Sequence, residues 1–183
     1  MAEVILITGG SRSGKSAYAQ KIAETLTGPR LFVATCPLID DEMRERIRKH
    51  QKKRQASDWQ TIEETVDLAG AVSGGRDYQV MLVDCLTLWV NNLMHEAQRE
   101  GRDITEEDIS HLCRELLAVC AELNSTVIFV TNEVGMGIVP DNPTSRKYRD
   151  LAGRCNQIIA SGADTVTIVT CGLPLHLKQR DES

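Results

Sequence analysis

The sequence predicts an α/β protein with three layers, in which helices cover both faces of a mostly parallel central sheet. Two observations carry this prediction. Five short runs of apolar residues have the continuous Val, Ile and Leu content that is typical of strands buried on both faces. Longer segments with helical periodicity lie between these runs, and such alternation favours a parallel sheet.

The expected elements follow along the chain. We expect strands at EVILIT (3–8), RLFVAT (30–35), QVMLVD (79–84), STVIFVT (125–131) and DTVTIVT (164–170). We expect helices at residues 15–27, 40–54, 86–99, 105–123 and 144–161. GLPLHLK (172–178) would add an edge strand, although Pro174 cannot donate a ladder hydrogen bond. Gly74 and Gly75 predict a turn, and no linker or repeat interrupts the chain, so residues 1–183 are expected to form one domain.

Composition narrows the class of protein. The 183 residues are 42% hydrophobic and 26% charged, as in globular proteins. A net charge of -5 argues against a general nucleic-acid binder, which would present a broad basic surface. The six cysteines form no CxxC pair, and several lie in apolar runs, where we expect them to be buried as small hydrophobes. No run approaches membrane-spanning length, so we expect a cytoplasmic protein with reduced thiols.

A phosphate-binding motif follows the first expected strand. GGSRSGKS matches GxxxxGK[ST] between a strand and a helix, where backbone N–H groups can surround phosphates. Lys15 is expected to reach the β- and γ-phosphates, and the Ser16 hydroxyl to ligate Mg²⁺. Asp84, at the end of QVMLVD, is expected to help hold the metal, although an Asp there is also common as a turn or helix cap. The sequence therefore predicts a site for a nucleoside triphosphate.

The base-reading segment of small GTPases is missing. Residues 131–134 are TNEV, which has neither the Lys nor the Asp of an Asn-Lys-x-Asp motif. This absence argues against a small GTPase.

His50 lies within a basic run, in DDEMRERIRKHQKKR at residues 40–54. Helical spacing puts it on one face with Met43 and Ile47, which favours a packing role. Imidazole is also a good nucleophile at neutral pH, and attack on an α-phosphate would need cations nearby. Lys49, Lys52, Lys53 and Arg54 could supply those cations. The residues alone leave both roles open.

Three blocks together resemble a known family. GGSRSGKS, FVATCPLIDDEMRERIRKHQKKR and TNEVGMGIVPDNPTSRKYRDLAGRCNQ are similar to the adenosylcobinamide kinase / adenosylcobinamide-phosphate guanylyltransferase family. The resemblance implies a three-layer P-loop NTPase fold of the RecA-like type. It also implies phosphorylation of the adenosylcobinamide hydroxyl with ATP or GTP. GMP is then transferred from GTP through a GMP-histidine intermediate, at the position that His50 matches.

The resemblance also implies a set of site residues. The nucleotide site would be lined by Gly9, Gly10, Ser11, Arg12, Ser13, Gly14, Lys15, Ser16, Ala34, Thr35, Cys36, Gln51, Lys52, Lys53, Arg54, Glu63 and Asp84. Family members can carry Ser at the position of Cys36 and Glu at that of Asp84. A homo-oligomer is implied as well, with a trimer as the expected size.

Two other functions remain in competition. One is a single-step small-molecule P-loop kinase in which His50 is structural, and the other is a regulatory or assembly protein that only binds nucleotide. The second and third blocks favour the bifunctional enzyme over both. The segment NEVGMGIVPDNPTSR is expected to bind substrate. Arg146, Arg149 and Arg154 on the following helix either contact phosphate or corrinoid side chains, or form plain helix surface with Arg146 and Asp150 as an i,i+4 pair.

Overall fold

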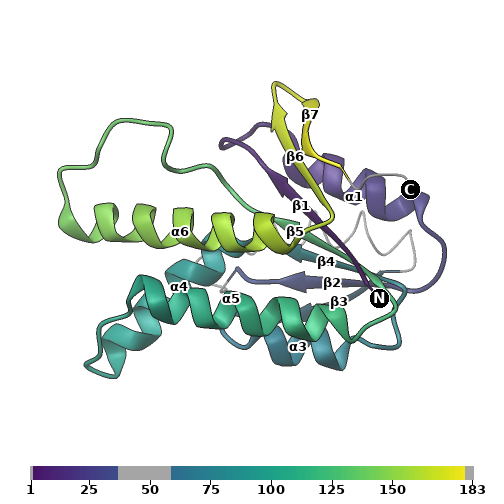
Figure 1. Ribbon diagram of the computed structural model, residues 1–183, viewed down its shortest axis with the longest axis horizontal. Coiled ribbons are helices and arrows are strands. Elements are labelled where there is room, and N and C mark those ends of the chain that lie inside the picture. Colours follow the sequence, from purple (N-terminus) through teal and green to yellow (C-terminus); the bar gives the residue numbers. More distant parts are fainter. Residues whose placement is uncertain (1, 37–58, 180–183) are drawn as a thin grey trace.

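The fold is built on a central sheet. The computed structural model describes residues 2–36 and 59–179. Within those residues seven strands form one sheet in the order β3-β2-β4-β5-β1-β6-β7, and β7 alone runs antiparallel to its neighbour (Figure 1). The strands are β1 (Glu3–Thr8), β2 (Arg30–Ala34), β3 (Trp59–Glu63), β4 (Val80–Asp84), β5 (Thr126–Val130), β6 (Thr165–Thr170) and β7 (Leu173–Lys178).

Helices cover both faces of the sheet. They are α1 (Lys15–Thr25), α3 (Leu68–Gly74), α4 (Leu86–Arg99), α5 (Glu106–Ala121) and α6 (Pro143–Gly162). Helix α1 packs on one face, whereas α3, α4, α5 and α6 pack against one another on the other (Figure 1). The predicted three-layer α/β architecture is therefore confirmed.

The apolar strand runs are explained by burial on both faces. In β1, Val4 and Leu6 belong to the core formed with α3 to α6, whereas Ile5 and Ile7 belong to the core formed with α1. Successive side chains of a strand point to opposite faces. A central strand must therefore be apolar at every position.

Local signals fix the starts of the long helices. Thr105 and Asp108 form a capping box at α5, in which each side chain accepts a hydrogen bond from the other residue's backbone N–H. The Asn142 side chain accepts from Thr144 N and Ser145 N at α6, and Pro143 occupies the first turn. These caps satisfy N–H groups that have no partner inside the helix.

Two elements were not predicted. Strand β3 has the mixed sequence WQTIE, in which only Trp59 is buried, so it shows neither an apolar run nor a clear alternation. Helix α3 spans only seven residues and contains two glycines. A turn was predicted at Gly74 and Gly75. The prediction was wrong for Gly74, which is the last residue of α3, and Gly75 is the C-cap of that helix.

The other predicted elements in the described part of the chain are confirmed, with ends shifted by one or two residues. They include the edge strand at 173–178, where Pro174 is tolerated because β7 borders solvent on one side. The helix expected at 40–54 lies outside the described residues.

The cysteines mostly behave as predicted. Cys85, Cys113, Cys120 and Cys155 are buried, and burial raises the pKa of Cys120 to about 12. Cys36 is half-buried, and Cys171 is exposed in the turn between β6 and β7. Among the residues that the structure describes, no helix is both long and apolar enough to cross a membrane.

Leu116→Ala tests the core between α5 and the sheet. Leu116 is fully buried, so we expect the free energy of unfolding to fall by about 2–5 kcal/mol through lost burial and a residual cavity. Chemical denaturation measures this change. Glu115→Ala, on the exposed side of the same helix, is the control and should change stability by less than about 0.5 kcal/mol. Equal effects of the two substitutions would contradict the packing described here.

Candidate nucleotide-binding site

The predicted site residues lie at one edge of the sheet. The register aligns Ile7 with Val130, Val130 with Asp84, and Asp84 with Ala34. Ala34 is in turn level with Glu63 on β3. The carboxyl ends of five parallel strands therefore meet at this edge, where α/β proteins commonly bind ligands.

The P-loop connects β1 to α1 and packs tightly against the β6–β7 hairpin. Gly9 has φ 150°, and a Cβ there would lie 2.4 Å from the Val169 carbonyl oxygen. Gly14 has φ 96° at the N-cap of α1, close to Gly172. Gly172 N also donates to the Ser13 carbonyl at 2.8 Å. Glycines are therefore required at both ends of the loop by backbone conformation and by close contact.

Two polar side chains are buried in this loop. Lys15 Nζ donates to the Gly10 carbonyl at 3.0 Å. Burial lowers the pKa of Lys15, and the nearby negative charge of Asp84 opposes that shift. Ser13 Oγ is buried and has no hydrogen-bond partner among the described residues. A phosphate oxygen in the loop would give Ser13 Oγ a partner and Lys15 a negative charge, which is the chemistry that the sequence predicts.

Asp84 ends β4, which is separated from β1 by β5. Thr35 holds the backbone at this position. Its N–H donates to the Asp84 carbonyl at 3.2 Å, and its hydroxyl both accepts from Cys85 N at 2.7 Å and donates to Cys85 O at 2.8 Å. Asn92 on α4 donates to the Thr35 carbonyl at 2.8 Å. The fully buried Thr35 thus fixes the strand end that carries Asp84.

Ser16 and Asp84 are the residues that could hold a metal ion. A hydroxyl and a carboxylate are oxygen ligands of the kind that Mg²⁺ prefers. Within residues 2–36 and 59–179, no group of three or more His, Cys, Asp or Glu side chains could hold a metal by itself. This fits Mg²⁺, which is usually held by one or two protein groups together with phosphate oxygens and water.

The other predicted site residues that the structure describes lie farther along the same edge of the sheet. Ala34, Thr35 and Cys36 lie at the end of β2, and the exposed Glu63 ends the neighbouring β3. Glu63 is four strands away from β1, or roughly 19 Å at about 4.8 Å per strand. His50, Gln51, Lys52, Lys53 and Arg54 lie outside the described residues. The described site residues therefore extend along one edge, from the P-loop through Asp84 and the end of β2 to Glu63.

One acidic residue at this edge was not predicted. Glu133 follows β5 by three residues, and its N–H donates to the Gly9 carbonyl at 3.1 Å. Its Oε1 accepts from Thr8 Oγ1 at 3.0 Å and from Asn156 Nδ2 at 3.0 Å. Glu133 lies within the segment NEVGMGIVPDNPTSR that was expected to bind substrate, but no separate role was predicted for it, although it is the first acid after an apolar strand.

The side chains of two arginines on α6 are hydrogen-bonded within the protein. Arg146 donates to the carbonyls of Pro140 and Asp141, at 2.9 and 2.6 Å. Arg154 Nε donates to Ser110 Oγ on α5 at 2.9 Å. These bonds support a structural role for Arg146 and Arg154. The i,i+4 ion pair expected between Arg146 and Asp150 does not form. The Asp150 carboxylate instead lies 3.8 Å from Arg149 Nε.

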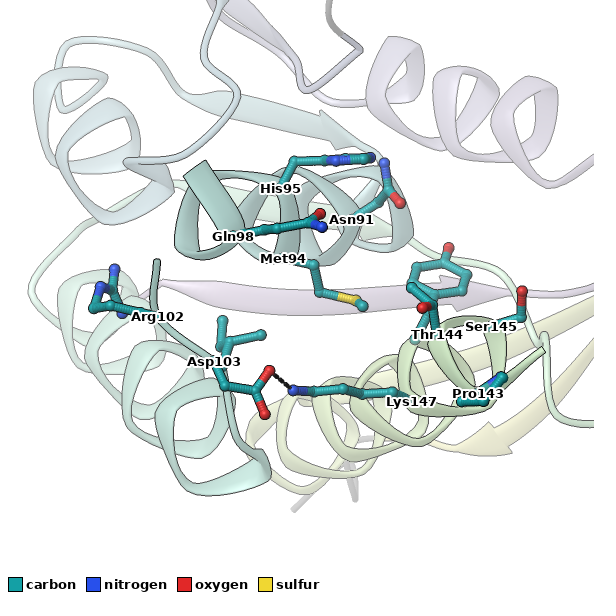
Figure 2. A pocket seen from close by; sticks show the side chains of 12 residues that line it. Asn91, Met94, His95, Gln98, Arg102, Asp103, Pro143, Thr144, Ser145 and Lys147 are labelled. Carbon is teal, nitrogen blue, oxygen red and sulfur yellow. Dashed lines mark hydrogen bonds and ion pairs between the residues drawn. The ribbon is translucent and has the colours of Figure 1, made fainter. Parts of the chain in front are cut away.

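A separate cavity of about 420 Å³ lies between α4 and the start of α6 (Figure 2). Met94 and His95 line it from α4, and the side chains of Lys147 and Asp103 form an ion pair along it (Figure 2). Helices α4 and α6 cover the face opposite to α1. The cavity is therefore distinct from the phosphate cradle at the start of α1.

Fold and site together define a P-loop nucleotide-binding protein: a strand, a phosphate-binding loop and a helix, with an acid at the end of a nearby strand. Solved structures agree on the fold. A KaiC-like protein from Pyrococcus horikoshii superimposes with a TM-score of 0.57 at 16% identity, over 98% of this chain and 80% of that one. An ATPase of a bacterial type III secretion system gives 0.60 at 13% identity, over 92% of this chain and 51% of that one.

Sequence comparison identifies the family. The profile described as cobinamide kinase / cobinamide phosphate guanyltransferase matches residues 5–177, so the chain belongs to this family. The bifunctional adenosylcobalamin biosynthesis protein CobU of Escherichia coli is 35% identical over 96% of this chain and 99% of its own length. CobU of Salmonella typhimurium is 38% identical over the same shares, and CobP of Pseudomonas aeruginosa is 40% identical over 94% of this chain and 96% of its own. The predicted family is thereby confirmed.

Lys15→Ala tests the phosphate cradle. We expect the Kd for ATP and for GTP to rise at least tenfold, because the variant loses the cation that faces the phosphates. Titration calorimetry measures both values. Lys21→Ala, an exposed lysine on the same helix, is the matched control and should leave both values within about twofold. Unchanged affinity in Lys15→Ala would remove Lys15 from the site.

Proposed function

We propose that the chain phosphorylates the hydroxyl of adenosylcobinamide with ATP or GTP and then transfers GMP from GTP to that phosphate. The product is adenosylcobinamide-GDP. The observation that carries the proposal is the P-loop with Asp84 two strands away, in a chain that belongs to the cobinamide kinase / cobinamide phosphate guanyltransferase family. Both reactions would use one nucleotide-binding domain spanning residues 1–183.

The first reaction is a phosphoryl transfer. The backbone N–H groups of the P-loop and Lys15 would bind the triphosphate, and Ser16 and Asp84 would hold Mg²⁺. Bound there, Mg²⁺ would neutralise charge that develops on the phosphate oxygens. The chain's own residues would keep the γ-phosphorus in line with the incoming hydroxyl, and this positioning supplies most of the catalysis in such transfers.

The second reaction requires a nucleophile near the α-phosphorus. We assign this role to His50, whose imidazole would displace pyrophosphate and form a phosphoramidate with GMP. The substrate phosphate would then displace the histidine. Gln51, Lys52, Lys53 and Arg54 would hold the nucleotide beside it. The spread of site residues along the sheet edge, from the P-loop to Glu63, supports this scheme, because γ- and α-phosphate chemistry need different reacting points.

The proposal includes a homo-oligomer, with a trimer as the expected size. Leu173, Leu175 and Leu177 on β7 are 71%, 63% and 60% exposed. Leu173 and Leu175 alternate along the regularly paired part of the strand and therefore share one face, whereas Leu177 lies at a shift in the register between β6 and β7. An apolar surface of this kind supports self-association.

His50→Ala separates the two reactions. We expect incubation with α-labelled GTP to leave an acid-labile, alkali-stable label on the unmodified protein and none on the variant. The variant should keep kinase activity, because phosphoryl transfer to a hydroxyl needs positioning and metal but no covalent histidine.

His111→Ala, an exposed histidine on α5, is the control and should be labelled normally. An unmodified protein that phosphorylates the corrinoid but takes up no label would support the single-step kinase instead. Equal loss of both activities in folded His50→Ala would contradict the proposed division of roles.

Nucleotide choice should differ between the steps. The P-loop contacts phosphates, so we expect the kinase reaction to proceed with ATP and with GTP. The guanylyl step must read the base, and a pocket that pairs with the guanine edge can reject adenine by several orders of magnitude. The labelling of histidine by α-labelled GTP should therefore exceed its labelling by α-labelled ATP by at least about 100-fold. Comparable labelling would show that the base is not read at the covalent step.

A further inference from the structure

Glu133 is held rigidly beside the phosphate loop. Its backbone N–H donates to the Gly9 carbonyl, at the first residue of the P-loop motif. Its side chain receives hydrogen bonds from Thr8, the last residue of β1, and from Asn156 on α6. Asn156 is itself fixed by Thr131 Oγ1, which donates to its Oδ1 at 2.7 Å. A carboxylate anchored from two elements keeps one orientation.

The topology puts this carboxylate between the two halves of the phosphate site. Strand β5 lies directly between β1, which leads into the P-loop, and β4, which ends in Asp84 (Figure 1). Val130, the last residue of β5, is level with both Ile7 and Asp84. A group just beyond β5 is therefore close to the place where the γ-phosphate and its metal would lie.

The hydrogen bonds leave one carboxylate oxygen available. Thr8 and Asn156 both donate to Oε1, and neither bonds Oε2. Glu133 is half-buried, so its side chain is neither sealed in the core nor fully in solvent. Fixed donors on one oxygen, and a second oxygen that has no donor among the described residues, suit a group that must accept a proton at a defined position.

Other acids at this edge are less suited to that task. Asp84 would be engaged by the metal. Glu63 is three strands away from β5, or roughly 14 Å at about 4.8 Å per strand. Among the described residues at the ends of β1, β5 and β4, Glu133 is therefore the acid that remains for proton transfer.

We propose that Glu133 is the proton acceptor of the kinase step, an inference that rests on the proposed function. The substrate oxygen forms a bond to the γ-phosphorus while the bond from that phosphorus to the β-phosphate oxygen breaks. The nucleoside diphosphate leaves with the electron pair of that bond. The hydroxyl proton passes to Glu133 Oε2 and then to solvent, so the atoms and charges balance.

The guanylyl step needs no acceptor for a hydroxyl proton. A neutral imidazole attacks through a lone pair, and the substrate phosphate that later displaces it is already an anion. No hydroxyl has to lose a proton in either half of that reaction. Removing the proton acceptor should therefore impair the kinase step alone, whereas damage to the P-loop would impair both.

Glu133→Gln is the decisive variant, because the amide oxygen can still accept from Thr8 and Asn156 while the basic carboxylate is lost. With adenosylcobinamide and ATP we expect the kinase kcat to fall at least 100-fold, by about the usual contribution of general base catalysis. The KM for ATP should stay within about threefold, and protein labelling from α-labelled GTP should be retained. Glu24→Gln, an exposed acid on α1, is the control and should leave both reactions unchanged.

Glu133→Asp excludes a purely structural role. The variant keeps a carboxylate but shortens the side chain, so it disturbs the hydrogen bonds to Thr8 and Asn156 more than Glu133→Gln does. If the carboxylate is the proton acceptor, Glu133→Asp should nevertheless retain more kinase activity than Glu133→Gln, whereas a structural role would give the opposite order. A lower kinase kcat in Glu133→Asp than in Glu133→Gln, a kinase rate in Glu133→Gln within threefold of the unmodified protein, or equal loss of kinase and labelling would each overturn the proposal.

The unmodified protein distinguishes this proposal from the proposed function. If it phosphorylates adenosylcobinamide and Glu133→Gln does so equally well, only the role of Glu133 fails. If it does not phosphorylate adenosylcobinamide at all, the proposed function fails, and the role of Glu133 falls with it.

Discussion

The parallel pairing of five neighbouring strands is the constraint on which the site depends. Parallel strands end at the same edge, and here the register makes Ile7, Val130, Asp84, Ala34 and Glu63 level with one another. Residues more than a hundred positions apart in the sequence are thereby brought together. The apolar side chains of both cores fix that register, because a slip of one residue would expose every buried side chain of a strand.

Hydrogen bonds from polar side chains then fix the backbone at the strand ends more closely than burial of apolar side chains can. Thr35 bonds both backbone groups of Cys85, and Asn92 bonds Thr35 in turn. Thr8, Thr131 and Asn156 form a corresponding set around Glu133. Buried threonines and asparagines are expensive unless they are hydrogen-bonded, so their presence at the strand ends indicates that they orient the acids beside them.

Sequence reasoning recovered the parts of the fold that depend on local pattern. The strands buried on both faces carry continuous apolar runs. Helices α1 and α4 to α6 carry a helical period, and the P-loop carries a glycine motif. Strand β3 and helix α3 do not, because β3 lies at the sheet edge and α3 is short and contains Gly70 and Gly74. Glu133 was missed for a different reason. Its importance comes from lying just beyond β5, the strand between β1 and β4, and the order of strands in a sheet cannot be derived from a single sequence.

The antiparallel hairpin of β6 and β7 links the apolar surface of the protein to its phosphate loop. The exposed leucines are on β7, whereas Val169 and Gly172 of the same hairpin contact Gly9, Ser13 and Gly14. A partner that restrains β7 would therefore also restrain the loop. If the proposed self-association uses β7, it and triphosphate binding would be linked equilibria, in which each event changes the free energy of the other by the same amount. The nucleotide affinity of this protein would then depend on protein concentration.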